Sequence, residues 1–277
     1  MKLKKKAKVM IVMTIVAGLL SGCSFGETKI EYERFVKALD EGDMKTVMSA
    51  SDDGYAHLEE RVIHSTLEEK EDGIYKKNVY QTTDGVYNTK EKNLYGSTTQ
   101  TVTTKIDTRK EKDKIKNYNK EKVYSTNIKY ENGQVQSTNL SLEVSQVKLL
   151  MDRLHGVGKL KMKPGDDKKG FDEPNSVGYE LSEAEFQQMI NDKLKLQYDE
   201  YGGASIVLNF DAAKDSKEKP MELSELSVSV NYKKKNEEGK VVTSILQINT
   251  YFAGRKYNNQ DALKDYEKYK KQYENNG

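Results

Sequence analysis

The spacing of apolar residues changes period several times along the chain, and each change predicts a different kind of element. Apolar side chains first recur at the spacing of one helix face shortly after residue 28, at Ile30, Tyr32, Phe35, Val36 and Leu39. Thr28, with Glu31 three residues later, has the pattern of a capping box, and Asp43 precedes a second short helix. The two segments predict a helical hairpin at the N-terminal end of the folded part.

From about residue 54 the period becomes two, which is the period of a half-buried strand. The predicted strands cover about 75–82, 86–90, 94–107, 121–130 and 134–144. Glycine accepts the positive φ of a tight hairpin, and such turns are predicted at Glu71-Asp72-Gly73, Asp84-Gly85, Glu131-Asn132-Gly133 and Glu237-Glu238-Gly239. Tyr124, Ile128 and Tyr130 alternate with polar residues, which indicates an antiparallel sheet that is wet on one face.

The C-terminal half begins with a short apolar stretch from Val147 to Leu154, predicted as a helix or the end of a strand. Ser182 and Glu185 then form a second capping box, with Leu181 and Phe186 placed as a hydrophobic staple, and this predicts a helix. Three alternating segments follow, at about 204–210, 226–232 and 246–252. A helix followed by antiparallel strands with one apolar face predicts an α+β fold.

The chain ends in a stripe of apolar and aromatic residues at helical spacing, formed by Ala262, Tyr266, Tyr269 and Tyr273. A helix docked on the protein, or on a partner, by its tyrosines is one interpretation, and a helix lying on a membrane is the other. Lysines and acids balance along this segment, so it has no net attraction to anionic lipid. Docking is therefore the favoured interpretation.

The first residues have the pattern of an export signal. Five lysines without an acid precede an uncharged run from Val9 to Leu20, which is too short to span a bilayer as a helix. The run ends in Leu20-Ser21-Gly22-Cys23, which resembles the lipobox of bacterial lipoprotein signal peptides. The resemblance implies cleavage between Gly22 and Cys23 and a diacylglycerol on the Cys23 sulfur, often with an added acyl chain such as palmitate. It also implies anchoring on the extracytoplasmic face of the cell membrane.

Two other interpretations of the leader stay open, namely a secreted protein with an incidental cysteine and an uncleaved anchor. Cys23 is the only cysteine, so no disulfide can form within the chain. The predicted domains are a signal peptide (1–22), a lipidated tether (23–29), an α+β domain (30–253) and a helical tail (254–277). Lys163 to Pro174 holds two of the three prolines, and a subdivision near 156–174 stays open.

Composition and charge narrow the classes of function. The 35% of hydrophobic residues suffices for a core despite a mean hydropathy of −0.85. Loss of the leader, with its five lysines, changes the formal net charge from +2 to −3. A mildly acidic body of this kind is no electrostatic match for nucleic acid, so no nucleic-acid partner is expected.

No catalytic or metal-binding motif is visible in the sequence. It has no Gly-x-Ser-x-Gly elbow, phosphate loop or dinucleotide fingerprint. His57 and His64 lie seven residues apart, so on one strand they would face opposite sides. The acids around Asp166 and Asp172 do not fit the spacing of an EF-hand loop. We therefore predict no enzyme activity, no cofactor and no metal site.

The order of elements over about residues 55–253, a helix followed by an antiparallel meander in an acylated exported protein, resembles the LolA-like and LppX-like lipoproteins. The segment from Tyr32 to Val47 also resembles the opening of small secreted lipoproteins with cystatin-like or NTF2-like folds. The first resemblance implies a strongly curved antiparallel sheet with helices packed on one face. It also implies an apolar cavity that holds an acyl chain or another apolar ligand.

Two hypotheses of function follow. The first is a non-catalytic protein that binds an apolar or amphipathic ligand in the hollow of the sheet, in a cavity lined by Phe186, Ile190, Leu208, Phe210, Val228, Val230, Leu246 and Ile248. The second is a surface interaction or regulatory lipoprotein with a solid core that binds a protein partner. The sequence leaves the ligand, the partner and the oligomeric state open.

Overall fold

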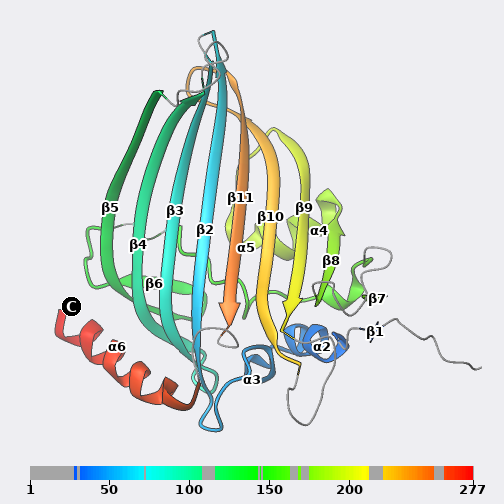
Figure 1. Ribbon diagram of the computed structural model, residues 1–277, viewed down its shortest axis with the longest axis vertical. Coiled ribbons are helices and arrows are strands. Elements are labelled where there is room, and N and C mark those ends of the chain that lie inside the picture. Colours follow the sequence, from blue (N-terminus) through cyan, green and yellow to red (C-terminus); the bar gives the residue numbers. More distant parts are fainter. Residues whose placement is uncertain are drawn as a thin grey trace, which may run out of the picture.

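A nine-stranded antiparallel sheet dominates the protein, shown in Figure 1 as a computed structural model. The structure describes residues 28–29, 32–71, 73–107, 116–142, 144, 146–162, 168–169, 175–211, 221–252 and 259–276. The leader and Cys23 lie outside the described residues, and so do Glu31 and the acids at 166–167 and 172–173. The predictions made for those residues therefore stay predictions.

The sheet consists of two meanders that meet in its centre. The strand order is β6-β5-β4-β3-β2-β11-β10-β9-β8. The first meander comprises β2 (Tyr55–Lys70), β3 (Gly73–Asn88), β4 (Asn93–Asp107), β5 (Lys116–Glu131) and β6 (Gln134–Ser137). The second comprises β8 (Asn175–Leu181), β9 (Glu200–Phe210), β10 (Leu223–Lys235) and β11 (Val241–Phe252). The pairing of β2 with β11, in which Val62 lies opposite Ile248, joins the two.

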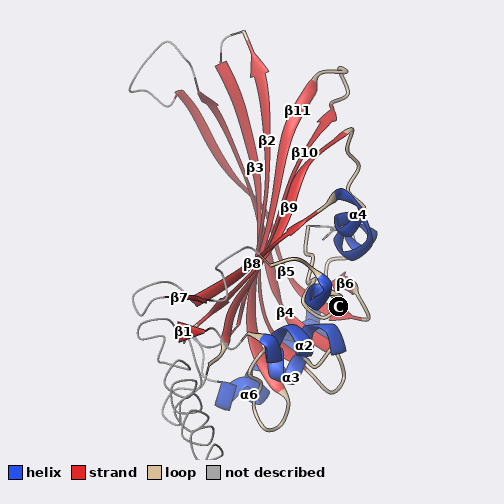
Figure 2. Cartoon of the chain, turned by 90° about the vertical axis from the view of Figure 1, so that its right-hand side faces the viewer, coloured by secondary structure: helices blue, strands red, loops and turns tan. Residues whose placement is uncertain are grey.

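Strand alternation gives the sheet two faces. We call the face that carries Leu58, Val62 and Ile248 the inner face, and the face that carries Val86 and Tyr95 the outer face. Side chains of the inner face build the main core with α2 (Glu33–Glu41), α3 (Met44–Val47), α4 (Glu183–Phe186), the π-turn η2 (Gln187–Asn191) and α5 (Asp192–Leu194). Figure 2 shows α2 and α4 on the same side of the curved sheet. The predicted curved antiparallel sheet is thus confirmed.

The C-terminal helix α6 (Ala262–Asn276) packs on the outer face instead, across β3, β4 and β5. Ala262 and Tyr266 form a small second core there with Val86 and Tyr95. The expected docking by tyrosines is observed, but helices lie on both faces of the sheet. The reason is the alternation of β3 and β4, which leaves apolar side chains on each face at this end of the sheet.

Residues 146–162, between β6 and β8, cross the inner face, and their only helical element is the short 3-10 helix η1 (Val157–Lys159). We call residues 146–162 the crossover. Its apolar side chains are buried in the main core, namely Leu149, Leu150, Met151, Leu154 and Val157. The prediction of a helix or strand end for this stretch is wrong, because side chains and not backbone ladders hold it in place. Small outlying elements are β1 (Thr28–Lys29), paired with β7 (Lys168–Lys169), and η3 (Asn259–Asp261).

The predicted turn at Asp84-Gly85 is also wrong, because β3 runs straight through it. Gly85 lies directly opposite Gly96 of β4. A Cβ on Gly85 would lie 2.8 Å from the Tyr95 carbonyl oxygen, and one on Gly96 would overlap the Asp84 carbonyl oxygen. The glycines therefore permit a close approach of two backbones and serve no turn.

Two of the predicted helix caps are present, and the one predicted for the first helix is not. Ser182 and Glu185 form the expected capping box, and the Asp43 side chain accepts from Thr46 N–H. The first helix begins later than predicted, at Glu33, and its N-cap Tyr32 makes no side-chain cap. Thr28 belongs to β1.

Candidate functional site

The eight side chains predicted to line a cavity are all in the main core. Their exposed fractions are 0–3%; six lie on β9, β10 and β11, and Phe186 and Ile190 lie on α4 and η2. Phe210, for example, lies with its ring centroid 5.4 Å from that of Phe35 in α2. None of the eight lines either of the two pockets described below.

The larger pocket, of about 800 Å³, opens at the β6 edge of the inner face, and we call it the β6 pocket. Its walls come from the β5–β6 turn, β6, the loop after β6, the start of the crossover and α5, with Tyr273 of α6 at one side. Its apolar lining consists of Val135, Leu140, Leu142, Val144, Val147 and Leu194. Leu140 is 96% exposed, so a large apolar side chain stands in solvent at the rim.

Three cationic side chains line the same pocket, namely Lys148, Arg153 and Lys193. An Arg153 Nη2 donates to the Lys148 carbonyl oxygen at 2.6 Å, while Arg153 Nε is buried without a hydrogen-bond partner. Burial lowers the pKa of Lys148, nearby Glu60 raises it, and the Arg153 charge lowers it again. Lys193 Nζ lies 2.8 Å from Asp192 Oδ1. No carboxylate is among the described residues that line the pocket.

Buried carboxylates hold the crossover, and with it one wall of the pocket, against the sheet. Glu60 of β2 is fully buried on the inner face and accepts from the backbone N–H of Lys148 at 2.8 Å and of Leu149 at 2.6 Å. Burial raises the pKa of Glu60 to about 7, against the lowering effect of these two hydrogen bonds. Leu149 has a φ of 42°, so the backbone bends to present both donors to one side chain.

Two further carboxylates fix the rest of the crossover. Asp152 accepts from the hydroxyls of Tyr87 at 2.9 Å and Tyr130 at 2.6 Å. Burial raises the pKa of Asp152, and these hydrogen bonds act against the rise. Asp40 of α2 accepts from the backbone N–H of Gly156 at 2.7 Å, Val157 at 2.8 Å and Gly158 at 3.1 Å. The crossover is therefore held at both ends by carboxyl groups, and its first part forms one wall of the pocket.

Sequence reasoning missed these residues, and only Glu60 left a signal. It occupies the middle position of an apolar alternation, Leu58, Glu60, Val62, where a carboxylate must either be paired or mark a buried site. Lys148, Asp152 and Arg153 lie in an irregular segment that has no periodic pattern. Their proximity to β2 and β5 follows from the topology alone.

The second pocket, of about 460 Å³, lies beside α2. Tyr32 and Val36 line it on the helix, and Leu160, Met162 and Tyr179 line it on the crossover and β8. Its charged residues are mostly acidic, with Glu33, Asp40 and Glu41 facing the single cation Lys37 among the described lining residues. The two pockets thus differ in the sign of their charge.

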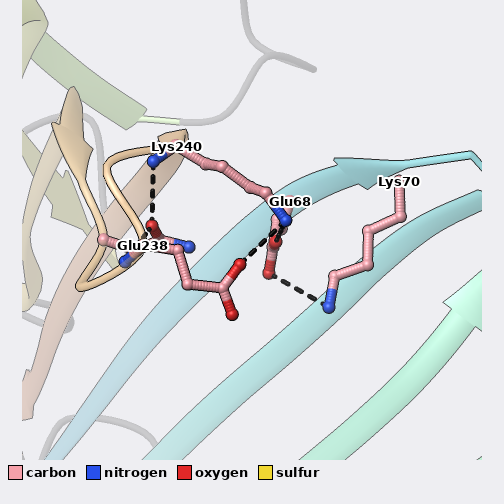
Figure 3. Close-up of polar contacts among 5 residues, drawn as sticks. Glu68, Lys70, Glu238 and Lys240 are labelled. Atoms are coloured by element: carbon pink, nitrogen blue, oxygen red, sulfur yellow. Dashed lines mark hydrogen bonds and ion pairs between the residues drawn. The ribbon is translucent and has the colours of Figure 1, made fainter.

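At the far end of the sheet, Figure 3 shows charged side chains of β2 meeting those of the β10–β11 turn. Lys240 Nζ lies 2.8 Å from Glu238 Oε2 and 4.0 Å from Glu68 Oε1, and Lys70 Nζ lies 3.6 Å from Glu68 Oε2. Acids and lysines alternate in this cluster, so it offers no patch of one sign. Exposed pairs of this kind contribute little to stability.

The histidines face as the sequence predicts. His57 points to the outer face, where its Nε2 lies 2.9 Å from Asp265 Oδ2 of α6. His64 points to the inner face, where its Nε2 lies 3.0 Å from the Tyr232 hydroxyl. Burial lowers the pKa of His64, and Lys234, Lys148 and Lys77 lower it further. No group of three metal-ligating side chains occurs in the part of the chain that the structure describes. Within the same ranges, no helix is long and apolar enough to cross a bilayer.

Comparison with known proteins gives one family match. Residues 18–123 match the family described as "Domain of unknown function (DUF3952)", a stretch that ends within β5 and covers less than half of the 277 residues. No curated protein matches the chain.

Two solved structures show weak likeness. A DUF1329 family protein from Desulfovibrio piger ATCC 29098 is 7% identical, with 83% of this chain and 95% of that chain covered and a TM-score of 0.21. An N-terminal dehydratase from the difficidin assembly line is 8% identical, with 85% and 88% covered and a TM-score of 0.15. TM-scores this low support no inference about function.

Proposed function

We propose that the protein is a lipid-anchored binding protein on the extracytoplasmic face of the cell membrane, without catalytic activity, that holds an apolar or amphipathic ligand against the inner face of its curved sheet. The observation that carries this proposal is the β6 pocket. Its volume of about 800 Å³ lies in the range of small-molecule sites, and its lining combines six aliphatic side chains with six polar or cationic ones. The pattern of residues 1–23 supports export and anchoring through Cys23.

The ligand site of this proposal differs from the cavity expected from sequence. The eight predicted side chains are buried in the main core, and none of them lines the pocket, which lies at the β6 edge. An open edge next to an irregular crossover suits ligand entry better than a core covered by helices does, because fewer packed side chains must move.

The alternative is a surface interaction or regulatory lipoprotein. The close packing of the predicted cavity residues favours it, since a solid core is what such a protein needs. Under this alternative the β6 pocket binds no small molecule, and the exposed surface contacts a protein partner.

Native mass spectrometry of the mature chain with Cys23→Ser separates the two proposals. The change removes the covalent anchor, so any lipid mass observed must be bound non-covalently. We expect a discrete added mass of a few hundred daltons that disappears after extraction with organic solvent. A bare polypeptide mass contradicts the binding proposal and favours the alternative.

A further inference from the structure

We infer, on the basis of the proposed function, that the β6 pocket takes an anionic single-chain amphiphile, with its carboxylate or phosphate head group at Arg153 and Lys148 and its acyl chain along the apolar wall. The pocket beside α2 does not suit such a ligand, because the charged residues of its lining are mostly acidic.

The arginine provides the first argument. Its side chain packs over the β5–β6 turn, with Cδ 3.2 Å from the position of a Cβ on Gly133. One terminal nitrogen donates to the Lys148 carbonyl oxygen, and Nε is buried without an acceptor. A guanidinium has five N–H donors in a planar fork that matches a carboxylate or phosphate. Since Arg153 lines the pocket, a ligand oxyanion there could accept from the terminal N–H groups of this fork.

The crowding of positive charge provides the second argument. Lys148 and Arg153 both line the pocket, and Arg153 Nη2 donates to the Lys148 carbonyl oxygen at 2.6 Å. Glu60 also acts on Lys148, but it is not among the lining residues and its carboxyl accepts from two backbone N–H groups, so the charged side chains of the described lining are all cationic. An anion placed between two such cations relieves their repulsion, and a neutral ligand does not.

The apolar wall provides the third argument. Val135, Leu142, Val144, Val147 and Leu194 line the pocket next to the cations, and Leu140 stands exposed at the rim. Val144, Val147 and Leu194 are only 6–8% exposed, so the wet apolar surface that an acyl chain could cover comes mainly from Leu140 and the half-buried Val135 and Leu142. Free phosphate satisfies the cations but leaves the wall wet, which is why the ligand must be amphipathic.

A tryptophan reporter tests the inference directly, because the chain has no tryptophan of its own. Leu140→Trp places the reporter at the pocket rim, and Leu263→Trp, at a position of α6 that is 40% exposed, is the matched control. The probes are palmitate, 1-palmitoyl lysophosphatidate, uncharged 1-palmitoylglycerol and inorganic phosphate, each below its micelle concentration. We expect saturable blue shifts of Leu140→Trp emission with the two charged lipids and no shift in the control reporter.

Charge variants in the Leu140→Trp background test the head-group site. Arg153→Met and, separately, Lys148→Met remove one cation each, while Arg153→Lys retains the charge without the fork. Lys45→Met, at an exposed position of α3 outside both pockets, is the control. We expect Arg153→Met to weaken binding of the charged lipids about tenfold, which is the effect of one charge-assisted hydrogen bond, and Lys45→Met to leave it unchanged. Circular dichroism shows which variants fold, and Lys148→Met, which removes the other proposed head-group cation, carries the test if Arg153→Met does not fold.

The outcomes separate this inference from the proposed function. If uncharged 1-palmitoylglycerol binds as tightly as the two charged lipids, the pocket does not select an anion. If inorganic phosphate binds as tightly as the charged lipids, an acyl chain is not needed. Lipid that co-purifies in native mass spectrometry without any response of Leu140→Trp places the ligand elsewhere, which overturns the inference and leaves the proposed function standing. If no lipid co-purifies and Leu140→Trp does not respond, both the inference and the proposed function are overturned.

Discussion

Among single residues, Glu60 has the largest influence on the candidate site. It is a carboxylate in the middle of the central strand, buried on the inner face and bonded to two backbone N–H groups of the crossover. The hydrogen bonds favour its charged form, but burial outweighs them and raises its pKa to about 7. One proton therefore decides how firmly the pocket wall is attached to the sheet.

Glu60 predicts a dependence of stability on pH. The unfolded chain releases this proton near the ordinary value of 4.5, and the folded protein keeps it up to about 7. The folded state thus binds more protons between these values, so the free energy of unfolding falls as the pH rises through this window, by up to about 3 kcal/mol. Urea unfolding of the wild type at about pH 5 and about pH 8.5 measures the fall.

Glu60→Gln is the matched variant, because glutamine has the same shape and no proton to release. We expect its free energy of unfolding to change much less between the two pH values, since only the remaining groups titrate. If the free energy of unfolding changed with pH by the same amount in the wild type and the variant, Glu60 would ionise freely in the folded protein.

Asp40 should affect stability through its hydrogen bonds to the crossover and not through a change of protonation. Its carboxylate accepts from three consecutive backbone N–H groups of the crossover, so Asp40→Ala leaves these donors without their partner. We expect a loss of about 2 kcal/mol in the free energy of unfolding. Glu41→Ala, which removes only an exposed pair with Lys37, should change it by less than about 0.5 kcal/mol. Equal losses in the two variants would disprove the anchoring role.

On the scale of elements, α6 is held by aromatic contacts on the outer face. The ring of Tyr266 lies 5.0 Å from that of Tyr55 and 5.4 Å from that of Tyr95, centroid to centroid. Its hydroxyl donates to Asn93 Oδ1 at 2.7 Å. The helix is otherwise polar, so most of its attachment depends on this tyrosine stripe.

Two substitutions of Tyr266 separate packing from hydrogen bonding. Tyr266→Ala removes the ring from the outer core and should cost about 3–4 kcal/mol of stability, whereas Tyr266→Phe loses one hydroxyl and should cost about 1 kcal/mol. Thermal or urea unfolding gives both values. Hydrogen exchange of α6 amides should be faster in Tyr266→Ala alone, and unchanged exchange would mean that the helix is held by other contacts.

Elements with a regular period were predictable from sequence, and those without one were not. The strands 94–107 and 121–130, the capped helix after Ser182 and the tyrosine stripe each repeat within a few residues, so local spacing reveals them. The Asp84-Gly85 turn was mispredicted because a glycine needed for close strand approach looks the same in sequence as one needed for positive φ. The crossover was mispredicted because its fold is determined by Glu60, Asp152 and Asp40, two of which lie about 90 to 120 residues away along the chain.

The candidate site was less predictable than the fold. Burial of the eight predicted residues follows from alternation, but the position of a pocket depends on which loop lies against which strand. That information resides in contacts such as those between Glu60 and Leu149, far apart in sequence. The local spacing of apolar residues shows which face of the sheet is buried. It does not show which parts of that face are covered by loops and helices and which parts stay open.

For the whole molecule, the proposed anchor predicts where the protein is found. Cys23→Ser abolishes the acceptor of the diacylglycerol, so the protein should move from the membrane fraction to the soluble extracytoplasmic fraction and should no longer incorporate a clickable palmitate analogue. Ser21→Ala, which keeps the cysteine, should leave both properties unchanged. Membrane retention of Cys23→Ser would refute the anchor.

The pairing of β2 with β11 affects how the protein is made. About 170 residues separate the end of one strand from the start of the other, yet the two are neighbours in the centre of the sheet. At about 5–20 residues per second, a ribosome delivers β11 roughly 10–30 s after β2. During that interval β2 has an unsatisfied hydrogen-bonding edge, so the nascent chain stays incompletely folded and open to chaperones until its last strand has been synthesised.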